Sequence, residues 1–202
     1  MEIEVGRIIR SNTSRFAVGC LVLQPQPKVP AFGSLVKAQA GDVEVYGLIY
    51  DVRMEDDPFV RQMATTDGLP AEYIADQRRN RQVPIEVGVL VVGYRRLSSG
   101  GGGGSFEYHL PPQPPLSLDV IHTCARDELV QFTEQFDYFR LVLDNQDLPA
   151  DELLAASLRY AAEARGSASA GRDYLLAAGR ELARLLAVDL ARLDSILRRI
   201  RP

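Results

Sequence analysis

The chain has 202 residues and a mass of 22.3 kDa, which suits one large domain or a small β domain followed by a helical appendage. A hydrophobic fraction of 46% with 25% charged residues excludes global disorder and a fibrous repeat. No window approaches the roughly 18 uninterrupted apolar residues that span a bilayer. We therefore expect a folded protein without a membrane-spanning segment.

The two cysteines, Cys20 and Cys124, lack the spacing of a metal site, and the N-terminus lacks the layout of a signal peptide. Both observations favour a cytoplasmic location. Residues 151–202 carry nine arginines and seven acidic residues, and the net charge of −4 therefore leaves −6 on residues 1–150. This acidic part repels a phosphate backbone, so the tail is the better candidate for nucleic-acid contacts.

The first half of the sequence has the character of β-strands. Residues 4–10 and 15–23 are β-branched runs joined by turn formers, which predicts a hairpin, and the three prolines in residues 24–32 predict a surface loop. Two further strands are predicted at residues 34–40 and 42–53, where Val43 and Val45 alternate with Glu44 and Tyr46. The apolar run at residues 84–96 predicts a central strand.

Two polar segments interrupt these strands. In the first, Pro70 stands at an expected first helical turn and residues 71–79 predict a short surface helix. The acidic residues 55–57 have the oxygens to hold a hard cation, but a solvated turn is the favoured interpretation. In the second, Gly100 to Gly104 predict a flexible linker, either natural or an engineered replacement for a longer loop.

Helical patterns follow the proline-rich spacer at residues 111–115. Thr123 is predicted to cap a helix over residues 126–132, and residues 137–143 suit either a strand or a helix. Two longer helices are predicted at residues 150–164 and 168–201, separated by Gly166. An apolar stripe on the second helix favours packing within the chain. That helix is expected to be roughly 50 Å long, which leaves part of the stripe for contact with another chain.

The motifs of common enzymes are missing from the sequence. It contains no P-loop, no GxSxG, no HExxH and no CxxC pair, so we expect no enzyme activity, no catalytic residue, no cofactor and no metal. His109 and His122 flank the proline spacer with poor geometry for a shared metal. Cys124 has two interpretations, a thiolate activated by a helix start or a buried structural thiol, and the second is favoured.

The order of motifs in residues 3–118 resembles the HAS-barrel, the small N-terminal β-barrel of HerA-type hexameric translocases and of the catalytic-ring subunits of rotary ATP synthases. The resemblance is carried by GRIIRSNTSRFAVG, VKAQAGDVEVYGLIYDVR, DGLPAEYI and PIEVGVLVVGYRR, and VEVYGLIYDVR is the most specific piece. It implies an α+β protein with a small N-terminal β-barrel over residues 1–118 and an α-helical region over residues 119–202.

The resemblance also implies a role, because the barrel of that family takes part in subunit assembly and docks a NurA-type nuclease in DNA-end processing. A helical tail stands here in place of the ATPase core, so ATP hydrolysis does not carry over. The hypothesis is therefore a protein-interaction or oligomerisation module that acts with a HerA-type ATPase or a NurA-type nuclease. The residues expected at the partner interface are aromatic and arginine side chains of the polar segment, namely Phe59, Arg61, Tyr73, Arg78 and Arg79.

Two other hypotheses remain open at this point. The first is a nucleic-acid-binding barrel that uses the arginine-rich tail, which the acidic barrel disfavours. The second is an uncharted hydrolase in which Asp51, His109 and His122 come together in a cleft.

Overall fold

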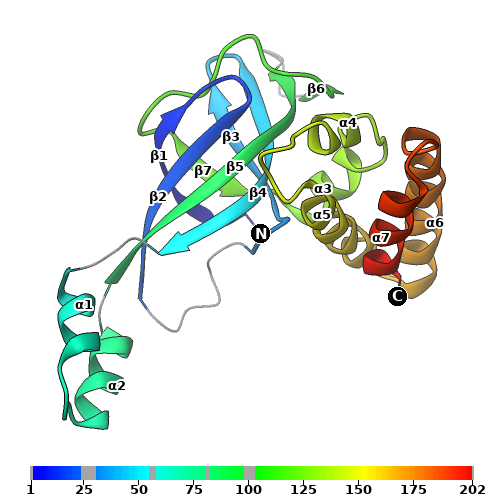
Figure 1. Cartoon of the computed structure of the whole chain (residues 1–202). Coiled ribbons are helices and arrows are strands. Elements are labelled where there is room, and N and C mark those ends of the chain that lie inside the picture. Colours follow the sequence, from blue (N-terminus) through cyan, green and yellow to red (C-terminus); the bar gives the residue numbers. More distant parts are fainter. Residues whose placement is uncertain (1, 24–30, 55–57, 81, 98–102, 202) are drawn as a thin grey trace.

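The computed structural model describes residues 2–23, 31–54, 58–80, 82–97 and 103–201. Its strands are β1 (Glu4–Ser11), β2 (Arg15–Leu23), β3 (Leu35–Ala40), β4 (Val43–Met54), β5 (Gln82–Leu97), β6 (Gly103–Glu107) and β7 (Val120–Thr123). Its helices are α1 (Pro58–Thr65), α2 (Ala71–Asn80), α3 (Arg126–Phe132), α4 (Phe139–Leu143), α5 (Ala150–Ala164), α6 (Ala168–Leu185) and α7 (Leu190–Ile200). This is the predicted α+β arrangement, a small N-terminal barrel followed by helices (Figure 1).

Six strands close the barrel in the order β1-β7-β3-β4-β5-β2, because β2 also pairs with β5, and β6 adds to β5 outside the closed ring. All six neighbouring pairs are antiparallel, and the closing pair places Phe16 opposite Val89. Closure pairs the backbone groups that a sheet edge would otherwise expose.

The alternation predicted for β4 separates two cores. Val43, Val45 and Ile49 point into the barrel, where every one of them is buried. Tyr46 and Leu48 point outwards and are equally buried, because α3, α4 and α5 cover this outer face. A strand that is apolar on both sides is thus explained by a barrel with a helical layer packed against one wall.

Phe132 of α3 lies at the centre of the contact between the helices and the barrel. Its ring is fully buried and stacks on Tyr46 of β4 at 5.2 Å between centroids. It also lies 5.3 Å from Phe106, 5.2 Å from Tyr108 and 5.5 Å from Tyr138, ring centre to ring centre. Aromatic contacts of this kind add to the free energy gained from burial alone.

The structure moves the end of the barrel beyond residue 118. Residues 120–123 form β7, which lies between β1 and β3, so the strand pairing extends to Thr123. Thr123 does not cap a helix as predicted: its hydroxyl accepts a hydrogen bond from the Ile3 N–H at 2.9 Å, and α3 begins only at Arg126 after Ala125. The tertiary pairing of β7 overrides the local capping signal.

The predicted helix over residues 168–201 is two helices. The chain leaves the helical conformation after Leu185, and Asp189 starts α7 by accepting a hydrogen bond from the Arg192 N–H at 3.0 Å. Leu182, Ile196 and Ile200 are buried in the core that α5 shares with both helices. The apolar stripe therefore folds back on itself and packs within the chain, as the sequence favours, and the expected helix length of roughly 50 Å is corrected to two shorter helices.

Several local elements form where the sequence predicts them. The hairpin of β1 and β2, the strands predicted at residues 34–40 and 42–53 and the helix at residues 71–79 are confirmed, and residues 137–143 contain the short helix α4. The proline-rich loop at residues 24–30, the acidic residues 55–57 and the glycines 100–102 lie outside the described residues. No helix in the described part has the length and apolarity to cross a bilayer.

Leu118 has the only positive φ among the described non-glycine residues, 74°, and its side chain is 69% exposed. The loop is fixed by hydrogen bonds from the Leu118 N–H to Ile8 O at 2.8 Å and from Arg7 Nη1 to Leu118 O at 3.0 Å. A leucine in this conformation costs about 1–2 kcal/mol relative to its ordinary backbone states.

Leu118→Gly is therefore expected to leave the free energy of unfolding unchanged or to raise it by about 1 kcal/mol, because glycine relieves the strain. Leu116→Gly, at a neighbouring side chain that is 70% exposed without a positive φ, is the matched control and is expected to lower it by about 0.5–1 kcal/mol. Urea unfolding measures both. An equal loss in the two variants would refute the strain at Leu118.

Candidate functional site

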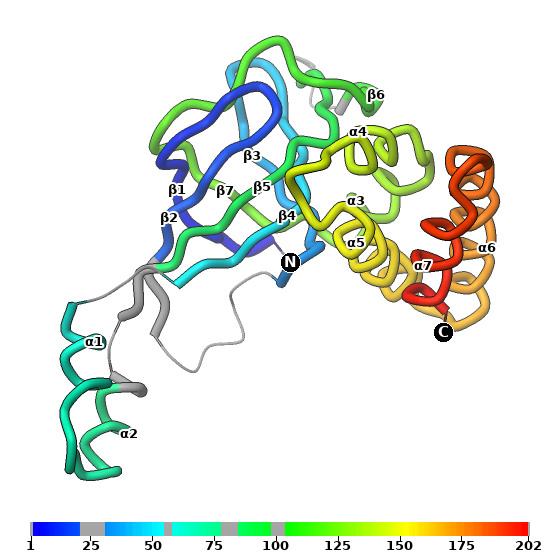
Figure 2. Tube along the Cα trace, viewed as in Figure 1, coloured from blue at the N-terminus to red at the C-terminus, as the bar shows by residue number. Residues whose placement is uncertain are grey.

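The five residues predicted at a partner interface all lie on two consecutive helices, α1 and α2. Phe59 and Arg61 belong to α1, and Tyr73, Arg78 and Arg79 belong to α2. These two helices, called the arm below, follow β4 and precede β5. The arm extends from the lower end of the barrel, with the barrel between it and α3–α7 (Figure 2).

The arm carries apolar side chains that remain partly exposed to solvent. No residue of α1 is buried, and Phe59 and Val60 are 39% and 45% exposed. On α2, Tyr73 and the neighbouring Ile74 are each 41% exposed. Sequence reasoning missed α1, and with it Val60, because a segment of eight residues has too few turns for a clear helical period.

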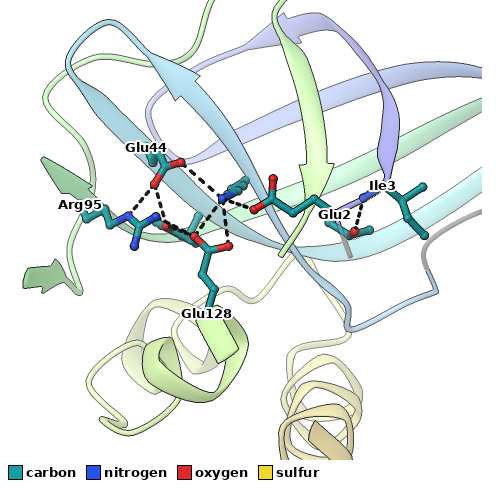
Figure 3. Close-up of polar contacts among 8 residues, drawn as sticks. Glu2, Ile3, Glu44, Arg95 and Glu128 are labelled. Carbon is teal, nitrogen blue, oxygen red and sulfur yellow. Dashed lines mark hydrogen bonds and ion pairs between the residues drawn. The ribbon is translucent and has the colours of Figure 1, made fainter. Parts of the chain in front are cut away.

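A charged cluster also connects the barrel to α3, in addition to the aromatic contacts of Phe132 (Figure 3). Lys37 of β3 lies with its Nζ 2.9 Å from Glu2 Oε1 and 3.0 Å from both carboxylate oxygens of Glu128, on α3. Arg95 of β5 donates to Glu44 Oε2 at 2.5 Å and to Glu128 Oε1 at 2.9 Å. The side chains of Lys37, Glu44, Arg95 and Glu128 are 12%, 17%, 19% and 9% exposed, so the cluster is largely withdrawn from water.

The strand register explains how distant residues form this cluster. Glu44 stands directly opposite Arg95 in the β4–β5 pair, and Lys37 stands opposite Tyr46 in the β3–β4 pair. The Tyr46 hydroxyl donates to Glu128 Oε1 at 2.7 Å. Only the alternation of β4 was visible in the sequence, because the pairing partners and α3 come from separate segments.

The electrostatics of the charged cluster favour the ionised forms of Lys37 and Glu44. Burial tends to lower the pKa of Lys37, but its bonds to Glu2 and Glu128 outweigh burial and raise that pKa above its ordinary value. Burial tends to raise the pKa of Glu44, and the Arg95 guanidinium and Lys37 outweigh it and lower that pKa. Burial and the adjacent Glu128 raise the pKa of Tyr46. An ammonium and carboxylates paired in this way are suited to joining two units and poorly suited to proton transfer at neutral pH.

The residues of the hydrolase hypothesis lie at separate places. Asp51 pairs with Arg53 at 3.1 Å on β4, and exposed His109 lies 3.6 Å from Glu107, ring nitrogen to carboxylate oxygen. His122 belongs to β7. Within the described ranges no contact connects the three, and no group of three or more His, Cys, Asp or Glu is placed to hold a metal ion.

Cys124 lies just before α3, and burial raises the pKa of its thiol, the direction opposite to that of a reactive thiolate.

Most arginines of the tail have partners within the chain. Arg184, Arg192, Arg198 and Arg199 form ion pairs with Glu181, Asp151, Asp194 and Glu152. Arg126 donates to Ala164 O at 2.6 Å, and Arg165 donates to Ala161 O at 2.6 Å. Few cations of the tail therefore remain for a phosphate backbone.

The comparisons with known proteins add no relative. No family model matches the sequence, and no curated protein matches it.

Proposed function

We propose that this protein is a non-catalytic interaction and assembly module whose partner-docking surface is the arm. The proposal depends on one observation about the arm. Its side chains Phe59, Val60, Tyr73 and Ile74 are all exposed, and no residue of α1 is buried. Aromatic and branched apolar side chains that gather on a projecting element are typical of interfaces, where aromatic residues supply much of the binding energy.

Two further features suit this role. Each of the six strands of the closed ring pairs with two neighbours, so the ring provides a rigid base. The charged cluster and the Phe132 contacts fix the helices α3–α7, called the helical unit, to that base. The arm extends from the barrel at a place away from α3–α7, which leaves it accessible to a partner.

The partner classes proposed are a HerA-type ATPase and a NurA-type nuclease, by the resemblance of residues 3–118 to the HAS-barrel. In that arrangement the partner supplies the nucleotide or DNA chemistry, and this chain supplies a docking surface. The module is proposed to act in the cytoplasm, in DNA-end processing.

The test measures binding of purified full-length protein to the purified ATPase and nuclease encoded in the same genome, by titration calorimetry. Phe59→Ala with Tyr73→Ala is expected to weaken binding at least tenfold, about 1.4 kcal/mol, because two exposed anchors are removed. The matched control is Val188→Ala with Leu190→Ala, which removes two exposed apolar side chains of the helical unit and is expected to leave affinity unchanged. Absence of binding to both enzymes, or equal loss in the two double variants, would contradict the proposal.

A further inference from the structure

One stripe along α6 combines an exposed leucine with two uncompensated cations. Leu176 is 62% exposed, and Arg172 and Arg180 stand four residues before and after it, which places all three on the same face of the helix. Both arginine side chains are exposed, and in the described part of the chain neither makes a hydrogen bond or an ion pair. This stripe is called the basic ridge.

A groove whose carboxylates outnumber its arginines lies beside the same helix, between α3, the end of α5 and α6. Its volume is about 780 Å³, and its apolar lining includes Val130, Phe136 and Tyr174. Asp127, Glu134 and Asp173 contribute three exposed carboxylates to its lining. Arg126 and Arg165 also line it, and their guanidinium groups donate to the Ala164 and Ala161 carbonyls. Over the described ranges, no cation forms an ion pair with any of the three. This feature is called the acidic groove.

The chain itself does not pair these surfaces, because the residues that α6 contributes to the ridge and to the groove face different directions around its axis. We propose that they pair between two copies of this chain, with the basic ridge of each copy seated in the acidic groove of the other. Leu176 would then contact the apolar floor, and Arg172 and Arg180 would meet the carboxylates of the lining.

A two-fold axis permits both contacts at once, since a self-complementary surface is what such symmetry requires. Charge complementarity selects this occupant. A basic ridge repels a second basic surface, and an acidic groove rejects an acidic helix, so each surface finds its complement on the same chain. The inference deepens the proposed assembly function, on which it rests, but it uses a surface separate from the arm.

The experiment uses charge reversal on the full-length protein and measures molecular mass by sedimentation equilibrium. The wild type is expected to form dimers that dissociate as the salt concentration rises. The ridge variant, Arg172→Glu with Arg180→Glu, and the groove variant, Glu134→Lys with Asp173→Lys, are each expected to weaken self-association at least tenfold. An equimolar mixture of the two variants is expected to restore dimers, because both contacts then join opposite charges.

Arg53→Glu with Arg96→Glu is the matched control, since it makes the same change in net charge as the ridge variant on the exposed barrel surface and is expected to leave the dimer intact. A monomeric wild type, or a mixture of variants that stays monomeric, overturns the inference. Binding of DNA by the monomer that is lost in the ridge variant also overturns it and assigns the arginines to a phosphate backbone. The variant Phe59→Ala with Tyr73→Ala is expected to dimerise normally, so failure of arm docking is distinguished from failure of this contact.

Discussion

Replacing Glu128 with alanine is expected to lower the free energy of unfolding by about 3–5 kcal/mol. The change leaves the Lys37 ammonium, the Arg95 guanidinium and the Tyr46 hydroxyl without the carboxylate to which all three now bond. Because these groups are largely withdrawn from water, solvent does not fully replace the lost partner. Urea unfolding at pH 7, followed by far-ultraviolet circular dichroism, measures the loss.

Glu134→Ala is the control for this experiment, since Glu134 follows the same helix, is exposed and forms no ion pair with a described residue. Its effect is expected to stay within about 0.5 kcal/mol. Glu128→Gln is expected to fall between the two, because the amide oxygen still accepts from Tyr46 while the charge is gone. A loss in Glu128→Ala no larger than in Glu134→Ala would show that the charged cluster does not hold the helices to the barrel.

Phe132→Ala is expected to cost a similar amount, about 3–5 kcal/mol, through a cavity at the contact between α3 and the barrel. The ring is fully buried, and its four aromatic neighbours lie on different strands and loops, which cannot move together to fill the space. Thermal and urea unfolding both report the change, and the near-ultraviolet dichroism of the surrounding tyrosines is expected to weaken.

Phe59→Ala supplies the comparison, because it removes the same ring from the exposed arm and is expected to cost less than about 1 kcal/mol. Comparable losses from the two substitutions would mean that Phe132 is not central to the core. Coincident urea transitions in the near- and far-ultraviolet dichroism would show that the barrel and α3–α5 unfold as one cooperative unit.

The parts of this fold that were predictable from the sequence are those with a local signal. The alternation of Val43 and Val45 with Glu44 and Tyr46 predicted a strand, and four turn formers predicted the first hairpin. The four residues of β7 are too few to show a period, and only their pairing with β1 and β3 makes them a strand. The break between α6 and α7 contains neither glycine nor proline, so the continuing leucine pattern concealed it.

The candidate site was predictable to the same degree. Composition pointed to the arm, because aromatic and arginine residues there stand in a polar segment between two strands. Lys37, Glu44, Arg95 and Glu128 were not predictable as a cluster, since their proximity depends on the strand register and on the position of α3. Arg172 and Arg180 were not predictable as unpaired cations, because the sequence does not show which arginines of the tail form ion pairs.

The position of β7 in the ring has a consequence for folding during synthesis. Arg7 pairs with Val120, more than a hundred residues further along the chain, and β2 must wait for β5, which is made only after the arm. During synthesis the N-terminal hairpin therefore emerges long before its last neighbour exists. Contacts so distant in sequence make folding slow, and until β7 arrives β1 and β3 each present an open edge that invites aggregation or a chaperone.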